Sequence, residues 1–476
     1  MKLISATPPL PSLTAALKVL LISPYEIGRQ SFNIAQAAAW LDGEEFDASC
    51  LDLSVDTLKP EHLDGVQLIA IHLPMHTATR LAMAILPRIQ TLAPSAHVCV
   101  FGLYAPMNES LLRRLGAKTV LGGECDAGLL ALGRGLRAGE TTEQTEAETN
   151  LKGIAFRVPD RSGLPELSRY AGLRLPGGNV KTVGFADSSR GCKYLCRHCP
   201  VVPVYQGRFR VVPVDVVMAD IRQQVDAGAE HISFGDPDFL NGPTHALRLV
   251  QALHREFPQL TFDATIKIEH LVKHGSMLPT LRECGCNLII SAVEATDDTI
   301  LEHLKKGHTV ADFRRAVALV RESGIALAPT FVTFTPWTSV PMYVDLLSTV
   351  AELGLVNAVS PVQLSIRLLI PAGSHLLHIP GFQDYLGEFD EEMLGYPWRH
   401  PDPRVDALHD TVRELVAGDD ADDNRHQTFL AIWTAAHETL NCTPPPLPPV
   451  DESEIPRLTE PWYCCAEPTD RQLEGI

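Results

Sequence analysis

The chain has 476 residues, 45% hydrophobic and 21% charged, a composition that predicts two or three folded domains and excludes a disordered protein. Its formal net charge of −18 would repel a phosphate backbone, so we expect no nucleic acid partner. The sequence has neither an uncharged apolar run of about 18 residues nor a signal-peptide pattern, so we expect a cytoplasmic protein without membrane contact.

The first 150 residues alternate short apolar runs with amphipathic stretches. The runs predict three buried parallel strands and the stretches two crossover helices, at 17–23, 66–71, 97–101, 31–41 and 78–92. We expect the second helix to be kinked or interrupted at Pro87. This alternation is typical of a doubly wound, flavodoxin-like sheet, which we assign to a domain over residues 1–150. The Thr- and Glu-rich stretch 139–150 marks the approach to a linker at 151–180.

Six strand candidates, each ending in polar or glycine-rich residues, follow the linker. They lie at 182–187, 231–235, 260–266, 287–294, 325–334 and 362–369. Helices are predicted between them, for example at 215–227 and 310–323, each followed by a glycine. Successive β–α units predict a partial (β/α)6 barrel over 181–375, with its chemistry at the carboxyl ends of the strands. Residues 376–476 are Pro-rich and weakly periodic, so we expect an irregular C-terminal extension and tail.

Three cysteines directly after the first barrel strand carry the strongest chemical signal. Cys192, Cys196 and Cys199 form a CxxxCxxC motif. Three thiolates can hold three irons of a [4Fe–4S] cluster and leave the fourth iron open to a small molecule. A structural zinc site is the competing interpretation. Zinc normally takes four ligands, however, and His198 lies between two of the cysteines instead of at a helical offset, so the motif favours the cluster.

At the start of a β/α pattern, this motif resembles the radical S-adenosylmethionine (SAM) superfamily across about residues 181–375. The resemblance implies an enzyme whose three cysteines hold a [4Fe–4S] cluster. It also implies that SAM is chelated on the open iron and cleaved by an electron that an external reductant supplies.

The resemblance further implies residues that bind SAM. Gly235, Asp236 and Asp238 follow the second strand, where the family has a segment that receives the methionine ammonium group. They depart from the family's form of that segment, and ordinary turn residues are the alternative interpretation. Glu294, at the end of the fourth strand, resembles the SAM-ribose segment, with a helix N-terminal acid as the alternative.

Three more residues are expected near the mouth of the barrel. Lys267 and Thr333 follow the third and fifth strands. Arg367 lies near the end of the sixth strand, and a guanidinium group can bind the SAM carboxylate through two parallel hydrogen bonds. A buried structural ion pair would use the same arginine, and the sequence does not separate the two roles.

A doubly wound domain before a radical SAM barrel resembles the cobalamin-binding arrangement of a large subgroup, which carries DxHxxG after its first strand. Here Ser23 and Tyr25 occupy the Asp and His positions, so the usual cobalt ligand is absent. We therefore expect that the domain has lost cobalamin. The alternative is that it binds cobalamin without a protein ligand to the cobalt. Gly102 and Gly122–Gly123 would leave room for a nucleotide tail.

The segment WYCCAEP near the C-terminus contains two adjacent cysteines, Cys464 and Cys465. Soft thiolates suit trivalent arsenic and thiol–disulfide exchange, and a pair of uninvolved exposed thiols is the alternative. The segment resembles the tail of the CUAEP/CCAEP-tail radical SAM proteins, which carry cysteine or selenocysteine at the position of Cys465. Within that family, the resemblance extends to the radical SAM enzyme of arsinothricin biosynthesis.

This resemblance implies transfer of the 3-amino-3-carboxypropyl group of SAM to the trivalent arsenic of arsenite, forming hydroxyarsinothricin. It implies that Cys464 and Cys465 act as catalytic arsenite ligands, with Cys442 as a third. Cys284 and Cys286 are an alternative thiol pair, although barrel packing explains them better. Two other functions stay open: hydrogen abstraction from a peptide or metabolite by a 5′-deoxyadenosyl radical, and a non-catalytic iron–sulfur or thiol sensor.

Overall fold

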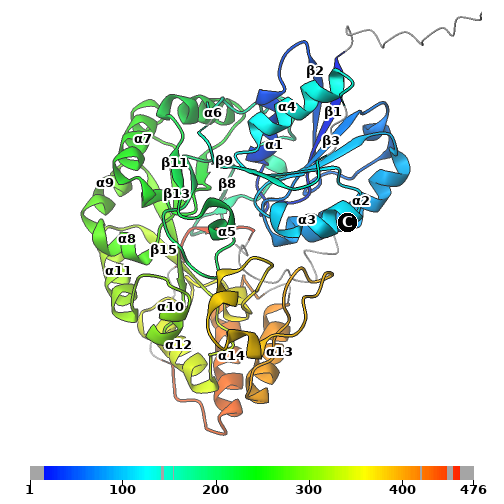
Figure 1. The fold of residues 1–476 in the computed structure, drawn as a ribbon. Coiled ribbons are helices and arrows are strands. Elements are labelled where there is room, and N and C mark those ends of the chain that lie inside the picture. The colour runs from blue at the N-terminus through cyan, green and yellow to red at the C-terminus, as the bar shows by residue number, and fades with distance from the viewer. Residues whose placement is uncertain (1–15, 141–143, 154, 419–420, 448–453, 461–476) are drawn as a thin grey trace, which may run out of the picture.

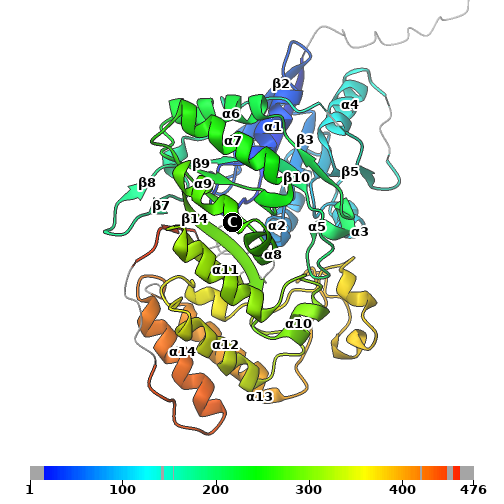
Figure 2. The same ribbon diagram turned by 90° about the vertical axis from the view of Figure 1, so that its left-hand side faces the viewer.

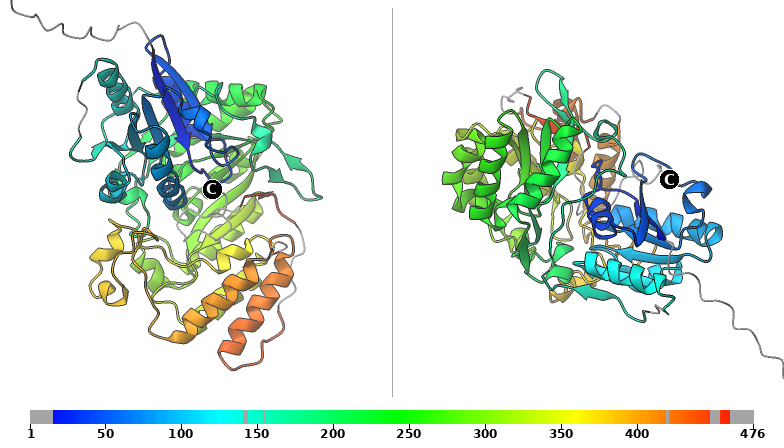
Figure 3. Two further views of the ribbon diagram at one scale, coloured as in Figure 1. Left: turned by 90° about the vertical axis from the view of Figure 1, so that its right-hand side faces the viewer. Right: turned by 90° about the horizontal axis from the view of Figure 1, so that it is seen from above.

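The computed structural model describes residues 16–140, 144–153, 155–418, 421–447 and 454–460. Along the chain it contains an N-terminal parallel sheet, a second parallel sheet surrounded by helices, and a C-terminal helical region (Figure 1). Seen from above, the N-terminal sheet lies beside the second sheet (Figure 3). Among the described residues, every helix is too short or too polar to cross a membrane.

The N-terminal sheet has six strands, all paired in parallel, in the order β2-β1-β3-β4-β5-β6. Alternate residues of β1 enter different cores, because successive strand side chains point to opposite faces. Leu20 packs with α2 and α3, whereas Leu21 packs with α1 and α4. The elements are β1 (Leu17–Ser23), α1 (Phe32–Trp40), β2 (Phe46–Asp52), η1 (Pro60–Leu63), β3 (Leu68–His72), α2 (His76–Leu92), β4 (His97–Phe101), η2 (Pro106–Asn108), α3 (Glu109–Arg114), β5 (Thr119–Gly123), α4 (Asp126–Arg137) and β6 (Glu148–Asn150).

The predicted parallel α/β sheet is confirmed for this domain, and β1 and β4 have the predicted bounds. The strand expected at 66–71 begins two residues later, at Leu68. The predicted interruption at Pro87 is absent, since α2 continues through this residue. The stretch 139–150 is not only an approach to a linker, because β6 lies at its end and pairs with β5.

The second sheet has five parallel strands in the order β15-β14-β13-β12-β9. A two-stranded hairpin, β10–β11, follows the first of them. Short helices cover the outer face of the sheet (Figure 2). The elements are η3 (Leu167–Arg169), β7 (Leu173–Arg174), β8 (Val180–Lys181), β9 (Val183–Ala186), β10 (Ser189–Gly191), α5 (Val201–Tyr205), β11 (Phe209–Val211), α6 (Val214–Asp226), β12 (His231–Phe234), η4 (Phe239–Asn241), α7 (Pro243–Glu256), β13 (Thr261–Thr265), α8 (Ile268–Lys273), η5 (Gly275–Met277), α9 (Leu278–Glu283), β14 (Cys286–Glu294), α10 (Asp298–His303), α11 (Val310–Glu322), β15 (Ala326–Phe331) and α12 (Val340–Glu352).

Five of the six predicted barrel strands are present. The sixth, predicted at 362–369, does not form a strand. The apolar run 362–369 overlaps the 3-10 helix η6 (Pro361–Leu364) and then forms one parallel bridge, between Phe334 and Arg367. Proline at the start of this segment has no N–H to donate and favours the first turn of a helix. The described barrel is therefore five strands plus a single bridged position.

The C-terminal region contains two helices, which corrects the expectation of an irregular extension. The buried residues of α13 (Pro403–Val416) and α14 (Arg425–Thr439) recur at helical spacing and join the barrel core. Beyond them, β16 (Arg457–Leu458) pairs with β7 in the linker. Short 3-10 helices, η7 (His375–His378) and η8 (Phe382–Tyr385), precede α13.

Arg161, in the linker, joins the two sheets through a buried guanidinium group. It donates to Gln30 Oε1 of the N-terminal domain at 2.7 Å. It also donates to both carboxylate oxygens of Asp220 on α6, at 2.6 and 2.9 Å, and to the backbone oxygen of Phe185 on β9. The side chains of Arg161 and Asp220 are 7% and 2% exposed. This pair therefore fixes the linker against both domains.

A second buried contact joins the domains on the other side of the interface. Arg190 on β10 donates to Glu124, directly after β5, at 2.8 Å and to Asp126, the first residue of α4, at 3.0 Å. Arg210 on β11 donates to the other oxygen of Glu124 at 3.0 Å. Burial alone would lower the pKa of Arg190, but the two carboxylates outweigh it and raise that pKa. The cysteine-bearing hairpin is thus attached to the N-terminal domain by charge.

Replacing Arg161 with Met should lower the free energy of unfolding by about 3 to 5 kcal/mol, because Asp220 would keep a buried charge without its partner. Urea denaturation measures this loss. The double variant R161M/D220N should recover part of it, since both charges are then removed. R134M, which breaks the exposed pair with Glu45, is the matched control and should cost at most about 1 kcal/mol. An equal effect of R161M and R134M would contradict the role given to Arg161.

Candidate functional site

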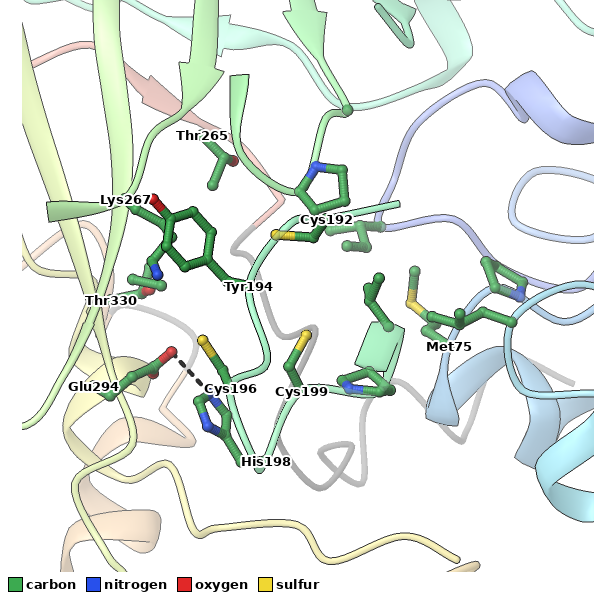
Figure 4. A pocket seen from close by; sticks show the side chains of 18 of the residues that line it. Met75, Cys192, Tyr194, Cys196, His198, Cys199, Thr265, Lys267, Glu294 and Thr330 are labelled. Carbon is green, nitrogen blue, oxygen red and sulfur yellow. Dashed lines mark hydrogen bonds and ion pairs between the residues drawn. The ribbon is translucent and has the colours of Figure 1, made fainter. Parts of the chain in front are cut away.

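The three cysteines of the CxxxCxxC motif line one cavity of about 310 Å³ between the two domains. They belong to the loop between β10 and α5, and Figure 4 shows them with Met75 of the N-terminal domain on one side and Glu294 on the other. Gly191, just before Cys192, has a φ of 72°, and a Cβ there would collide with the backbone oxygen of Arg208. The turn that places the first cysteine therefore requires glycine.

The donor set of this loop fits the expected [4Fe–4S] cluster. Cys196 is buried and Cys192 and Cys199 are half-buried, so the three thiols face a largely water-excluded space. Within the described ranges, no three His, Cys, Asp or Glu side chains converge on a point that would suit one metal ion. A cubane needs no such convergence, because each cysteine binds a different iron. Asn241 Nδ2 lies 3.5 Å from Cys192 Sγ and donates to it.

A buried charged cluster forms the wall beside Cys196 and Cys199. Glu294, at the end of β14, accepts from Lys306 Nζ at 3.0 Å and lies 3.1 Å from His198 Nε2. Burial alone would raise the pKa of Glu294, but the Lys306 ammonium and then the His198 ring outweigh it and hold that pKa well below its ordinary value. Glu294 thus lines the cavity as a paired carboxylate, with a φ of 71°.

Of the residues expected to bind SAM after the second strand, only Gly235 lines the cavity. Asp236 accepts from the backbone N–H of Ser188 at 3.0 Å and from the hydroxyl groups of Ser188 and Ser189. Burial raises the pKa of Asp236 to about 6 despite these bonds. Asp238 accepts from the backbone N–H of Lys267 at 3.1 Å and lies 2.7 Å from His270 Nδ1. Both aspartates therefore make contacts inside the barrel.

Lys267, after β13, does reach the cavity. Its ammonium lies 3.2 Å from the centre of the Tyr194 ring and 3.6 Å from Glu269 Oε2. The Tyr194 hydroxyl donates to Glu269 at 3.1 Å and lies 2.7 Å from His270 Nε2. Tyr194 lies inside the cysteine motif, so a cation and an aromatic ring share the wall near Cys192 (Figure 4).

Thr333 and Arg367 lie away from the cavity. The Thr333 hydroxyl donates to the backbone oxygens of the sixth segment. Arg367 donates to Asp406 of α13 at 3.0 Å, and its guanidinium carbon lies 3.7 Å from the Trp398 ring centre. The structure therefore assigns Arg367 the structural ion pair that the sequence left as an alternative. The expectation that Arg367 binds the SAM carboxylate is therefore corrected, because its guanidinium group is already paired with Asp406 of α13.

The remaining cysteines are distributed over several places. Cys284 and Cys286 are buried in the barrel core, as packing predicts, and do not line the cavity. Cys442 is exposed after α14 and donates to the backbone oxygen of His437 at 3.4 Å. Cys464 and Cys465 lie outside the described residues, so their predicted arsenite-binding role remains a prediction.

The described chain ends against the loop that follows β1, next to residues that line the cavity. Thr459 N donates to the backbone oxygen of Gly172 at 2.9 Å, and Glu460 accepts from the Tyr25 hydroxyl. A Cβ at Gly28 would lie 2.8 Å from the Cβ of Glu460, so glycine is needed for this approach. Tyr25, at the position where the related motif has histidine, therefore holds the C-terminal segment.

The N-terminal domain presents the carboxyl ends of its strands to the cysteines, the edge where open α/β sheets bind ligands. Glu26, Arg29 and Asn33 follow β1 and line the cavity, as do residues after β3 and β4. None of these three residues was predicted from the sequence to belong to the site. The signal was available, because polar residues directly after a predicted first strand point to this edge.

A second, smaller cavity of about 160 Å³ adjoins the first, and Asp187 and Gly235 line both. Gly102 and Gly123, two of the glycines expected to leave room for a nucleotide tail, line this second space. His72 lines it as well, and burial, followed by the charge of Arg190, lowers the pKa of His72 to about 3. The imidazole is therefore neutral.

Comparison with known proteins identifies the central part of the chain. Residues 187–337 match the family described as the Radical SAM superfamily. A tRNA-2-methylthio-N(6)-dimethylallyladenosine synthase of Chlorobium phaeobacteroides is 29% identical over 160 residues, covering 31% of this chain and 35% of that protein. The ribosomal protein uS12 methylthiotransferase RimO of Geobacter sulfurreducens is 25% identical over 205 residues, covering 38% and 45%. The matched region thus spans between about a third and less than half of the length of these curated relatives.

Solved structures share the fold over more of the chain. The cobalamin-dependent SAM radical enzyme OxsB with aqua-cobalamin bound has a TM-score of 0.70 and 15% identity, and covers 91% of this chain and 74% of that one. The radical SAM methyltransferase TsrM of Kitasatospora setae, with tryptophan and a SAM analogue, has a TM-score of 0.60 and 18% identity, and covers 71% of each chain.

These structures correct the expectation of no cobalamin. OxsB and TsrM share this fold and were both solved with cobalamin bound. Tyr25 at the histidine position removes only one possible contact with a large cofactor, so it does not exclude cobalamin. The chain therefore contains a radical SAM superfamily domain, at residues 187–337, behind a parallel-sheet α/β domain of the kind found in cobalamin radical SAM enzymes.

Proposed function

We propose that this protein is a radical SAM enzyme that transfers the 3-amino-3-carboxypropyl group of SAM to the trivalent arsenic of arsenite, forming hydroxyarsinothricin. The observation that carries the proposal is the position of Cys192, Cys196 and Cys199 on one interdomain cavity. The described chain ends at Glu460, against Tyr25 and Gly28 of the loop whose residues Glu26 and Ile27 line that cavity. Cys464 and Cys465 follow within five residues, a reach of at most about 18 Å for an extended chain.

The three cysteines would hold the [4Fe–4S] cluster, which when bound supplies one electron to the sulfonium of SAM and takes one back. In the net reaction the bond between sulfur and the methionine γ-carbon breaks, and sulfur leaves as methylthioadenosine. The arsenic lone pair provides both electrons of the new carbon–arsenic bond, so arsenic ends pentavalent and one proton is released. The sum needs no net oxidant.

Residues of the cavity wall would support this chemistry in two ways. They place a positive charge near the cysteines, and they exclude water. Lys306 lies close enough to Cys196 and Cys199 for an attractive interaction with their thiolates, and Glu294 holds its ammonium in place. Apolar side chains from both domains also line the cavity, among them Ile27, Leu103 and Phe331. Radicals formed there would be shielded from water.

The pair Cys464 and Cys465 is proposed to bind arsenite, because two thiolates suit a soft trivalent element. The exposed position of Cys442 outside the cavity gives no support to its role as a third ligand. A hydroxide could complete the coordination of arsenic.

A second candidate is cobalamin-dependent methyl transfer. It is supported by the shared fold with OxsB and TsrM and by the two adjoining cavities at the carboxyl edge of the N-terminal sheet. Its products would be S-adenosylhomocysteine, 5′-deoxyadenosine or both, together with a methylated substrate.

Replacing Cys192, Cys196 or Cys199 with Ala should remove the visible absorbance of the reconstituted cluster. SAM cleavage should fall at least about 100-fold, because a direct iron ligand is lost. Absorption spectra and product chromatography under anaerobic conditions measure both effects. Cys50, half-buried on β2 outside the cavity, offers the control C50A, which should keep both. Full activity in any of the three cavity variants would remove the radical SAM interpretation.

Anaerobic incubation of the intact protein with SAM, a reductant and arsenite should yield methylthioadenosine and an arsenic-containing amino acid in equal amounts. Mass spectrometry of the nucleoside and arsenic products measures this ratio. S-adenosylhomocysteine with a methylated product would favour the second candidate, and 5′-deoxyadenosine alone would favour hydrogen abstraction. Absence of SAM cleavage in cluster-loaded protein would leave a sensor or thiol carrier.

Replacing Cys464 and Cys465 with Ser should weaken arsenite binding about 100-fold, because two linked thiolates gain affinity from their high effective concentration. The cluster absorbance should stay unchanged. Equilibrium dialysis with arsenite measures the affinity, and C442S, which removes an exposed cysteine of the same C-terminal region, is the matched control. If arsenite binds C464S/C465S as tightly as the unmodified protein, the tail is not the acceptor site.

A further inference from the structure

Three ionisable side chains in the main cavity have no part in holding the cluster. Glu26 is 6% exposed and lines the cavity. Its Oε1 accepts from Asn33 Nδ2 at 3.1 Å. The nearby Ser31 hydroxyl stabilises the ionised carboxylate, but no full hydrogen bond reaches the buried Oε2 among the described residues. An unmet buried acceptor of this kind points to a donor that a ligand would bring.

Arg29 lies one turn further along the same loop, and its backbone N–H donates to the Glu26 carbonyl oxygen at 3.1 Å. Its guanidinium carbon lies 4.8 Å from the Phe185 ring centre. Within the part of the chain that the structure describes, no carboxylate comes within ion-pair distance of this guanidinium group. Its hydrogen-bonding edge is thus available to the cavity that Arg29 lines.

Asp187 approaches from the other domain, directly after β9. A Cβ on Gly235 would collide with its carboxylate, so the glycine leaves the space that Asp187 fills. Asp187 lines both cavities, and no hydrogen bond to its carboxylate occurs among the described residues. The domain interface therefore brings two carboxylates and one guanidinium group to the same space.

The electrostatics of these groups favour a positively charged ligand. Burial raises the pKa of Glu26 to about 7. Burial, followed by the charge of Asp236, raises the pKa of Asp187 to about 8. A cation placed between the two carboxylates would offset both effects. An ammonium group offers three donors, enough for both acids, and a carboxylate matches the planar fork of arginine.

We propose that Glu26, Arg29 and Asp187 bind the two ends of an α-amino acid, with its ammonium group against the two acids and its carboxylate against Arg29. Such a group has two sources: the methionine part of SAM, or a separate amino acid substrate. The first source rests on the proposed use of SAM, and the second does not.

The test uses cluster-loaded protein without a reductant, so binding is measured apart from turnover. In the first arm, equilibrium dialysis compares SAM with decarboxylated SAM. If SAM is the ligand, R29Q should weaken SAM binding about tenfold or more and leave decarboxylated SAM unchanged. E26Q and D187N should weaken both compounds, because both retain the ammonium group.

In the second arm, the twenty common L-amino acids are titrated individually into the SAM-loaded protein. If the ligand is a separate amino acid, one of them should bind, and its affinity should fall about tenfold or more in each of the three variants. SAM affinity should then stay constant. The proposal is overturned if the variants change neither SAM binding nor the binding of any of these amino acids.

Exposed residues provide matched controls, E44Q and R88Q, which should bind like the unmodified protein. Folding is checked by melting temperature. The amide variants should melt no lower than the unmodified protein at pH 8, because the ionised acids are disfavoured by burial. Failure of this test with methylthioadenosine still produced would overturn the amino acid site and leave the proposed function standing.

Discussion

Buried charge pairs between the domains determine where the chemistry can occur. Arg161 has buried partners in both domains, and Arg190 of the barrel pairs with two carboxylates of the N-terminal domain. Neither arginine can leave its carboxylate partners without a large electrostatic cost. Contacts of this kind are directional, unlike apolar packing. They set the carboxyl edge of the N-terminal sheet against the cysteine loop, so one cavity receives groups from both sheets.

Elements with continuous buried runs could be predicted from the sequence with correct bounds. The strand at Leu17–Ser23 is an example, because parallel strands covered on both faces need apolar residues throughout. The sixth barrel strand could not be predicted in the same way. Its apolar run is buried as well, but burial alone does not distinguish a strand from a 3-10 turn followed by one bridge. The C-terminal helices did carry a signal: Val405, Leu408 and Val412 recur at helical spacing.

Only part of the candidate site could be predicted from the sequence. The three cysteines could be predicted because local spacing encodes their chemistry. The structural role of Arg367 could not, since it depends on Asp406 and Trp398, which are distant in sequence. Arg367 is paired with Asp406 of α13, a helix in the region predicted to be irregular. The cobalamin expectation failed for a different reason: it judged a whole binding surface by one position, Tyr25.

The pairing of β16 with β7 has a consequence for how the molecule is assembled. Tyr25 and Glu460 are 435 positions apart, and Thr459 bonds to the linker before the barrel. These contacts therefore form only after the chain has been synthesised as far as Glu460. The loop that they hold also supplies Glu26, Ile27 and Arg29 to the cavity. One wall of the cavity is thus fastened by a segment that the ribosome makes more than 400 residues later.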